Sequence, residues 1–162
     1  MTAKGNGSGV AEAPTESLDE PRDPDLVALH RLWIAKRCLR LMPSKSDFDP
    51  AEFKRLLAGV VLMEAGPPGG PYIVRLVGEN IVDFFGRTTK GLPAGSLMQP
   101  EGYRAFMRLL DSVVQRRAPV FRAGKAYWSR DKAHRRFEAC FLPLSSDDRA
   151  VDMILGAVKF ER

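Results

Sequence analysis

The chain has 162 residues, of which 44% are hydrophobic, so it is long and apolar enough to bury one hydrophobic core. No apolar run approaches the ~18 residues that cross a bilayer. The opening stretch MTAKGNGSGVAEAP also lacks the apolar segment of a signal peptide. The two cysteines, Cys38 and Cys140, are far apart, which favours buried free thiols in a reducing compartment. We therefore expect a cytoplasmic protein with no membrane-spanning segment.

The net charge of +5 is unevenly distributed along the chain. Residues 1–25 carry two basic and six acidic side chains, a net charge of −4, while the other 137 residues carry 23 basic and 14 acidic ones, a net charge of +9. A solvated face or a docking site for an acidic partner is the commoner reason for such positive charge, and a nucleic-acid surface is the alternative. The basic residues concentrate at Arg104, Arg108, Arg116, Arg117, Arg122, Lys125, Arg130, Lys132, Arg135 and Arg136.

The first part of the chain combines a tail with two helices. Residues 1–24 are rich in glycine and proline and hold almost no large apolar side chain, so we expect a disordered acidic tail. Apolar residues then recur at three-to-four spacing, which predicts a helix capped by Asp25 and running to about Arg40. The segment MPSKSDFDP ends this helix, and Asp49 caps a second, shorter helix that ends at Leu57.

These helices, over residues 25–58, flank a core of residues 59–162. The stretches GVVLMEA and YIVRLV predict two strands of a hairpin, joined by the turn PPGG. Short helical turns and the amphipathic helix EGYRAFMRLLDSVVQRR follow. Three strands finish the chain, at Val120–Trp128, Arg135–Leu144 and Val151–Phe160. The order predicts an α+β fold with a five-stranded antiparallel sheet, one face of which is covered by the helices between the second and third strands.

Several stretches in a fixed order carry a resemblance to a known family. They are LHRLW, MPSKSDFDP, GVVLMEA, YIVRLVGENIVDFFGRTTKG and FLPLSSDDRAVDMILG, and together they extend over residues 26–160. The chain resembles PAS domains, and in particular small bacterial stand-alone PAS proteins. The resemblance implies a PAS fold, with a five-stranded antiparallel sheet, helices on one face and N-terminal flanking helices. It also implies that the helix after Gly78 forms one side of a pocket.

The residues themselves argue against a phosphate-binding loop at Gly78, because it is a lone glycine without the further glycines or the Lys-Ser/Thr pair of such loops. We expect a ligand pocket instead, although plain core packing is the alternative for each aromatic side chain. Arg75 either faces inward and needs an acceptor, or faces the open side of the sheet. The candidate pocket residues are Tyr72, Val74, Arg75, Phe85, Phe106, Met107, Leu110, Phe121 and Phe141.

The sequence offers no pattern for catalysis or metal binding. His30, His134, Cys38 and Cys140 have no ligand spacing, so we expect no metal site. Asp83 has no second carboxylate or base at a useful distance, and no nucleophile motif is present, so we expect no enzymatic activity and no catalytic residues. In comparison with haem-binding and flavin-binding PAS domains, the long helix has no histidine and no Asn-Cys-Arg-Phe motif occurs. Haem and flavin are therefore disfavoured, and the cofactor is left unknown.

The N-terminal helix is a candidate interface. It can pack on its own sheet or exchange across a dimer, and the resemblance favours a homodimer with Leu26, Leu29 and Trp33 at its interface. Because the last strand reaches Phe160, we expect no output domain. The sequence thus predicts a sensor or adaptor in bacterial signalling that binds a small ligand, a signalling protein, or both, by population shift. A nucleic-acid-binding regulator that uses the basic face is the alternative.

Overall fold

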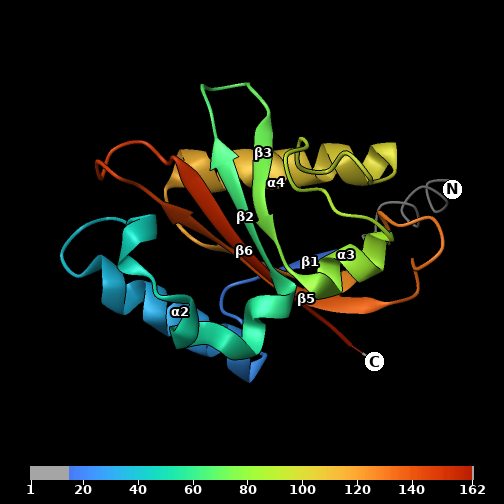
Figure 1. Cartoon of the computed structure of the whole chain (residues 1–162), viewed down its shortest axis with the longest axis horizontal. Helices are drawn as coiled ribbons and strands as arrows, with labels where there is room; N and C mark the ends of the chain where they lie inside the picture. The colour runs from blue at the N-terminus through green and yellow to red at the C-terminus, as the bar shows by residue number, and fades with distance from the viewer. Residues whose placement is uncertain (1–14, 162) are drawn as a thin grey trace, which may run out of the picture.

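A computed structural model describes residues 15–161, and within this range six strands form one antiparallel sheet (Figure 1). The spatial order of the strands is β1-β4-β5-β6-β2-β3. Their bounds are β1 Thr15–Leu18, β2 Val60–Ala65, β3 Tyr72–Val77, β4 Val120–Lys125, β5 Arg136–Leu144 and β6 Met153–Phe160. The helices are α2 Pro24–Arg37, α3 Glu79–Phe85 and α4 Pro100–Arg116, with two 3₁₀ segments, η1 Lys45–Asp47 and η2 Pro50–Gly59. The predicted α+β architecture with an antiparallel sheet is confirmed.

The predicted number of five strands is wrong, because β1 adds a sixth at the edge of the sheet. It pairs with β4 from Thr15↔Gly124 to Leu18↔Phe121. This strand lies inside the predicted disordered tail, so that prediction is wrong for residues 15–24, while residues 1–14 lie outside the described residues. Composition indicates only what a segment can bury by itself. Here the open edge of β4 supplies the backbone hydrogen-bond partners that the segment lacks.

A carboxylate contact continues the ordering of this segment into α2. The side chain of Glu138 on β5 accepts hydrogen bonds from the backbone N–H groups of Arg22, at 2.6 Å, and Asp23, at 3.1 Å. Asp23, rather than the predicted Asp25, then caps α2, because its carboxylate accepts from the N–H groups of Asp25 and Leu26. Helix α2 ends at Arg37, three residues before the predicted end.

The sheet is covered on both faces, with α2 below and α4 above the strands in the view of Figure 1. We call the face toward α3 and α4 the inner face and the face toward α2 the outer face. The alternation of β5 separates them, because Phe141 meets Phe106 of α4 on the inner face, while Glu138, at an alternate position, accepts from the backbone N–H of Asp23 at the start of α2. Farther along α2, the indole of Trp33 donates to the carbonyl of Pro143. The N-terminal helix therefore packs on its own sheet, which is the first of the two predicted alternatives.

Strand β4 ends at Lys125, three residues earlier than the predicted Trp128. The chain then makes a series of tight turns, in which the N–H of Tyr127 donates to the carbonyl of Lys125 at 2.8 Å and the N–H of Ser129 donates to the carbonyl of Ala126 at 3.0 Å. This loop, residues 126–135, carries Trp128 back toward α4, where the carbonyl of Trp128 accepts from the N–H of Gln99. A residue expected in the sheet therefore lies against the start of α4.

Candidate ligand pocket

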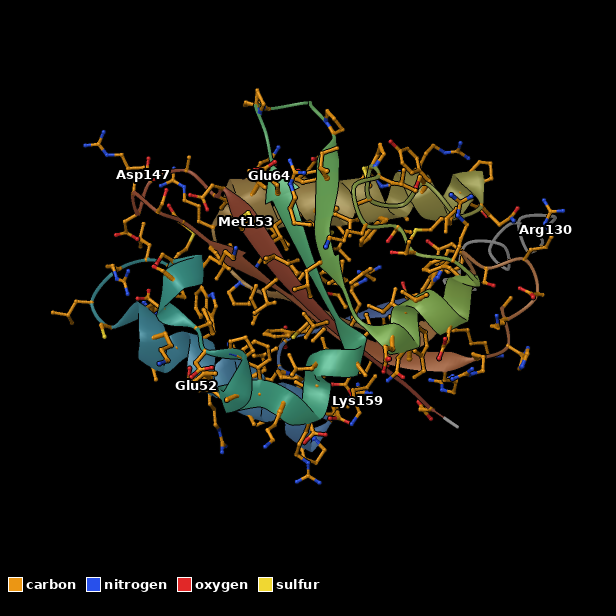
Figure 2. The ribbon with its side chains drawn as sticks, in the orientation of Figure 1. Glu52, Glu64, Arg130, Asp147, Met153 and Lys159 are labelled. Atoms are coloured by element: carbon orange, nitrogen blue, oxygen red, sulfur yellow. The ribbon has the colours of Figure 1, made fainter. Side chains whose placement is uncertain are left out.

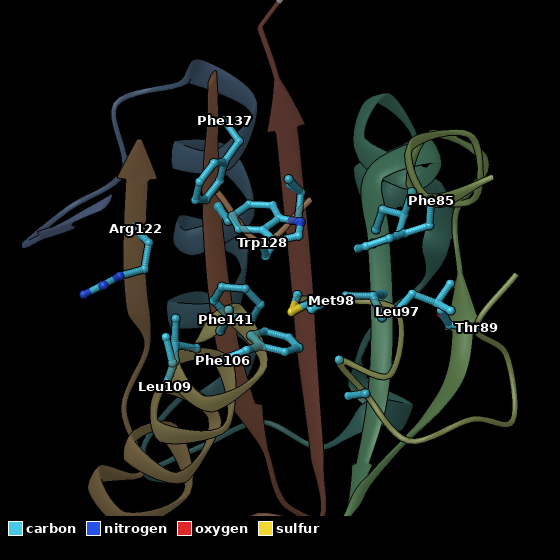
Figure 3. A pocket seen from close by; sticks show the side chains of 18 of the residues that line it. Phe85, Thr89, Leu97, Met98, Phe106, Leu109, Arg122, Trp128, Phe137 and Phe141 are labelled. Atoms are coloured by element: carbon cyan, nitrogen blue, oxygen red, sulfur yellow. The ribbon is translucent and has the colours of Figure 1, made fainter. Parts of the chain in front are cut away.

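A cavity of about 120 Å³ lies between the inner face of the sheet and helices α3 and α4 (Figure 3). Alternating residues of the strands point into it, because side chains on one face of a strand recur every second residue. Ala139 and Phe141 of β5 are examples, and Val158 and Phe160 of β6 follow the same alternation. The amphipathic stripe of α4 supplies Phe106 and its neighbours. The cavity is therefore walled by residues that local periodicity directs toward the core.

An aromatic cluster forms one end of the cavity. The ring of Trp128 meets Phe137 edge to face at a centroid distance of 4.6 Å, and Figure 3 shows the two rings adjacent on the sheet side. Gly102 on α4 allows this approach, because a Cβ atom there would lie only 2.4 Å from the Cβ of Trp128. A glycine in the first part of a helix thus sets how closely the loop that carries Trp128 can pack.

Few polar groups face the cavity. Thr89 lines it and is 8% exposed. Tyr127 also lines the cavity, and burial raises the pKa of its phenol, with the charge of Arg122 opposing this shift. The guanidinium of Arg122 donates to the hydroxyl of Thr15 at 2.8 Å, and Figure 3 shows this side chain directed away from the centre. The lining therefore suits an apolar molecule with very few polar atoms.

Four of the candidate pocket residues line the cavity: Val74, Phe85, Phe106 and Phe141. The other five do not. The structure places Met107 beside Gly95, and Leu110 is completely buried in the core, one helical turn beyond Phe106. Helical periodicity identifies the buried stripe of α4, but it does not show which part of that stripe meets a void.

The remaining three lie elsewhere for separate reasons. Tyr72 is buried, but its hydroxyl reaches Asp111 on α4 instead of the cavity. Arg75 is exposed and forms an ion pair with Glu64 on the neighbouring strand, which is the ordinary one of the two predicted positions. Phe121 lies on the outer face, where its ring contacts His30 of α2 at a centroid distance of 4.8 Å. A shift of one residue along a strand changes the face, so aromatic character alone misplaces it.

The three candidate interface residues are buried inside the chain. Leu26, Leu29 and Trp33 are 0%, 1% and 4% exposed, and the indole N–H of Trp33 donates to the carbonyl of Pro143 at 2.9 Å. The outer face of the sheet covers these apolar side chains within the same molecule. Their part in an interface between two copies stays a prediction.

The described residues also bear on the predicted chemistry. The prediction of two buried thiols is wrong for Cys38, which is exposed, whereas Cys140 is buried. Among residues 15–161, no three His, Cys, Asp or Glu side chains group together as metal ligands would. No helix in the same range combines the length and hydrophobicity that a membrane span requires.

Sequence reasoning missed Thr89, Trp128 and the small residues Gly102 and Ala139 that shape the cavity. The alternation of β5 could have placed Ala139 on the same face as Phe141. Nothing in the sequence of the loop 126–135 indicates that Trp128 folds back on α4, because that contact depends on tertiary packing.

An antiparallel sheet with helices packed over a small apolar cavity defines an α+β domain. The family model of the PAS domain matches residues 22–159. The chain therefore belongs to the PAS domain family. Among curated proteins, none matches it significantly.

Several solved structures are similar to this chain at low sequence identity. The PAS domain of BvgS from Bordetella pertussis is 18% identical, with a TM-score of 0.51, over 71% of this chain and 88% of that one. A variant of RsLOV is 18% identical, with a TM-score of 0.45, over 67% of this chain and 62% of that one. An RNA-binding light-oxygen-voltage receptor is 13% identical, with a TM-score of 0.46, over 90% of this chain and only 37% of that one.

Proposed function

We propose that the protein is a bacterial signalling sensor and adaptor whose inner-face cavity binds a compact apolar molecule. The observation that carries the proposal is the cavity itself, about 120 Å³ in volume and walled almost entirely by apolar side chains. For comparison, a dry apolar cavity of about 150 Å³ binds benzene. Sites for drug-sized ligands span roughly 300–1,000 Å³. The volume supports a ligand of about one ring and argues against haem and flavin.

Ligand occupancy would act on the partner by a population shift. Helices α3 and α4 and the loop 126–135 form the walls of the cavity, so a ligand stabilises the arrangement of these elements that encloses it best. A bound molecule changes the equilibrium only by its difference in affinity between the two arrangements. The partner is a signalling protein that recognises one of them.

The proposal includes the cytoplasm as the location, which agrees with two free cysteines, Cys38 and Cys140. It also keeps a homodimer as a prediction. Since Leu26, Leu29 and Trp33 are buried, a dimer would use another surface or exchange α2 between two copies. Light scattering of the purified full chain measures this directly, because a monomer has a mass of 18.0 kDa and a dimer has twice that mass.

The test of ligand binding is native mass spectrometry of the freshly purified chain, together with its visible absorption spectrum and its thermal unfolding with added indole. We expect extra bound mass, or stabilisation by indole. The variant Ala139→Leu, which fills the cavity from β5, should abolish either effect, since Ala139 is 1% exposed and lines the cavity. Ala150→Leu, on an exposed turn, is the matched control.

Two outcomes would contradict the sensor proposal. One is a clean apo mass without any stabilisation by indole. The other is equal binding by the folded Ala139→Leu variant, with folding checked by circular dichroism. The first outcome would favour a protein-interaction module with a packed core.

A further inference from the structure

A second concavity lies beside the C-terminal end of β6 and is separate from the inner-face cavity. We call it the basic cleft. Its volume is about 460 Å³, and it is bounded by η2, α3, β6 and the loop 126–135. Figure 2 shows Lys159 next to η2 at one side of it. Its polar lining consists of Arg55, Asn80, Asp83, Lys132, Arg135 and Lys159.

Arg135 is the key residue of the basic cleft. Its Nε atom is buried and has no hydrogen-bond partner among residues 15–161, and none of the ion pairs within that range includes Arg135. The guanidinium lies over the ring of Phe160 at 5.4 Å from the centroid. Because Arg135 lines the cleft without a carboxylate partner in the described part of the chain, an anion in the cleft would meet an uncompensated positive charge.

Lys132 provides a second cation in the basic cleft, beside the ring of Phe84. Its ammonium group donates to the carbonyl of Phe84 at 2.7 Å and lies 5.3 Å from the centroid of that ring. An ammonium group has three protons, so two remain for a ligand. The rings of Phe84 and Phe160 are stacked, with centroids 4.5 Å apart and an interplanar angle of 8°. The two cations are thus held by adjacent aromatic rings before any ligand arrives.

The other charges of the basic cleft are largely balanced. Lys159 donates to Asp25 at 2.8 Å and lies 3.8 Å from Asp23, and Arg55 lies 3.7 Å from Asp25. Asp83 adds one carboxylate to the wall. The uncompensated positive charge therefore belongs to Lys132 and Arg135, which confines the favourable region for an anion to their end of the cleft.

We propose that the basic cleft binds the phosphate group of a small phosphorylated molecule, with Lys132 and Arg135 as its ligands. A planar guanidinium and an ammonium are the side chains that bind phosphate best. The volume is in the range of about 300–1,000 Å³ typical of small-molecule sites, which leaves space for an organic part beside Asn80 and Asp83. A nucleic-acid backbone would need a continuous track of basic side chains. The basic cleft is instead bordered by the carboxylates of Asp23, Asp25 and Asp83, which would repel a long polyanion.

The two concavities share a wall, because Val158 and Phe160 line both the inner-face cavity and the basic cleft. The stacked ring of Phe160 has the Arg135 guanidinium on the cleft side. A phosphate ligand that orders Arg135 therefore also constrains the aromatic end of the cavity. This site is separate from the proposed sensor function and does not depend on it.

The test is calorimetric titration of the full chain with pyrophosphate at low salt, supported by NMR of the backbone amides. We expect saturable binding, with the largest amide shifts in residues 131–136 and 158–160. Arg135→Gln should raise the dissociation constant by about tenfold or more, and Arg135→Lys should restore only part of the affinity, because it keeps the charge but loses the planar fork. Arg130→Gln removes the same charge from an exposed position of the same loop outside the cleft, and it should leave the affinity unchanged.

Three outcomes would overturn the proposal. The first is the absence of saturable pyrophosphate binding. The second is an equal loss of affinity in Arg130→Gln and Arg135→Gln, which would indicate attraction by overall charge. The third is binding of a single-stranded oligonucleotide that competes with pyrophosphate and is weakened equally by both variants, which would indicate a nucleic-acid surface. Circular dichroism of each variant shows that lost binding is not lost folding.

Discussion

The phenol of Tyr72 donates a hydrogen bond to the carboxylate of Asp111 at 2.5 Å, and this contact joins strand β3 to helix α4. Tyr72 is 7% exposed, whereas Asp111 is exposed, so the bond lies at the boundary between core and solvent. Both elements wall the inner-face cavity, through Val74 on β3 and Phe106 on α4. The bond therefore holds the position of α4 over the sheet.

Tyr72→Phe should destabilise the fold by about 1 kcal/mol, because it removes a hydrogen bond to a charged group that solvent partly screens. Urea unfolding followed by circular dichroism measures the change. Tyr103→Phe is the control, since Tyr103 lies on the same helix, is 40% exposed and should have little effect. Equal stability of the wild type and the Tyr72→Phe variant would show that the bond does not hold α4.

The same contact predicts a loss of stability at alkaline pH. Burial first, and then the hydrogen bond and charge of Asp111, raise the pKa of Tyr72 well above its ordinary value. The unfolded chain therefore releases this proton at a lower pH than the folded chain does. The stability is fully present below about pH 10 and is lost as the pH rises toward the folded pKa. The free energy of unfolding, measured between about pH 9 and 11, should decrease as the pH rises. The Tyr72→Phe variant should show a smaller decrease.

Trp33 anchors α2 to the outer face. Trp33→Phe leaves the buried carbonyl of Pro143 without its donor, so we expect a loss of about 2 kcal/mol in the free energy of unfolding. Ile34→Ala changes the next residue of α2, which is 44% exposed, and should cost at most about 0.5 kcal/mol. Urea unfolding monitored by circular dichroism suits both variants. If both lose the same small amount, α2 is not anchored through this bond.

His30 makes the packing of α2 sensitive to acid. Its ring meets Phe121 edge to face, and burial lowers its pKa, which the charge of Glu20 partly opposes. Because the folded state favours the neutral ring, the unfolded state binds more protons near the ordinary histidine pKa. Stability should therefore fall as the pH decreases from about 7 to 5. His30→Gln should flatten this dependence, with His134→Gln in an exposed loop as the control. An unchanged slope in His30→Gln would exclude His30 as its source.

The two thiols should differ in reactivity. Cys38 is exposed at the end of α2, whereas Cys140 is completely buried, and burial raises its pKa to about 12. Because the thiolate is the reactive form, a chromogenic disulfide reagent should modify only Cys38 in the native protein. The second thiol should react after unfolding in denaturant. Cys38→Ser should remove the fast reaction, and a remaining fast reaction in that variant would show that the outer-face core opens readily.

The sequence indicated much of the fold because its elements are locally encoded. The alternation of Tyr72–Val77 and the apolar stripe of α4 correspond to a strand and a helix that the structure contains. The same local patterns placed Val74, Phe85, Phe106 and Phe141 toward the core, and these four line the cavity. The error at Phe121 arose because the face on which a strand residue lies depends on the register with the neighbouring strands, and the sequence of one strand does not contain that register.

By itself the sequence indicated the family, through the resemblance of its ordered motifs to PAS domains. It also determined the antiparallel sheet and the helix that covers its inner face, since these follow from residue periodicity and turn chemistry. Only the tertiary structure decided that residues 15–18 add a strand to β4, that α2 covers the outer face of its own sheet, and that Trp128 closes the cavity. It also brought Lys132 and Arg135 to the stacked rings of Phe84 and Phe160. Each of these features joins segments far apart in the chain, so its free energy comes from contacts that local sequence does not contain.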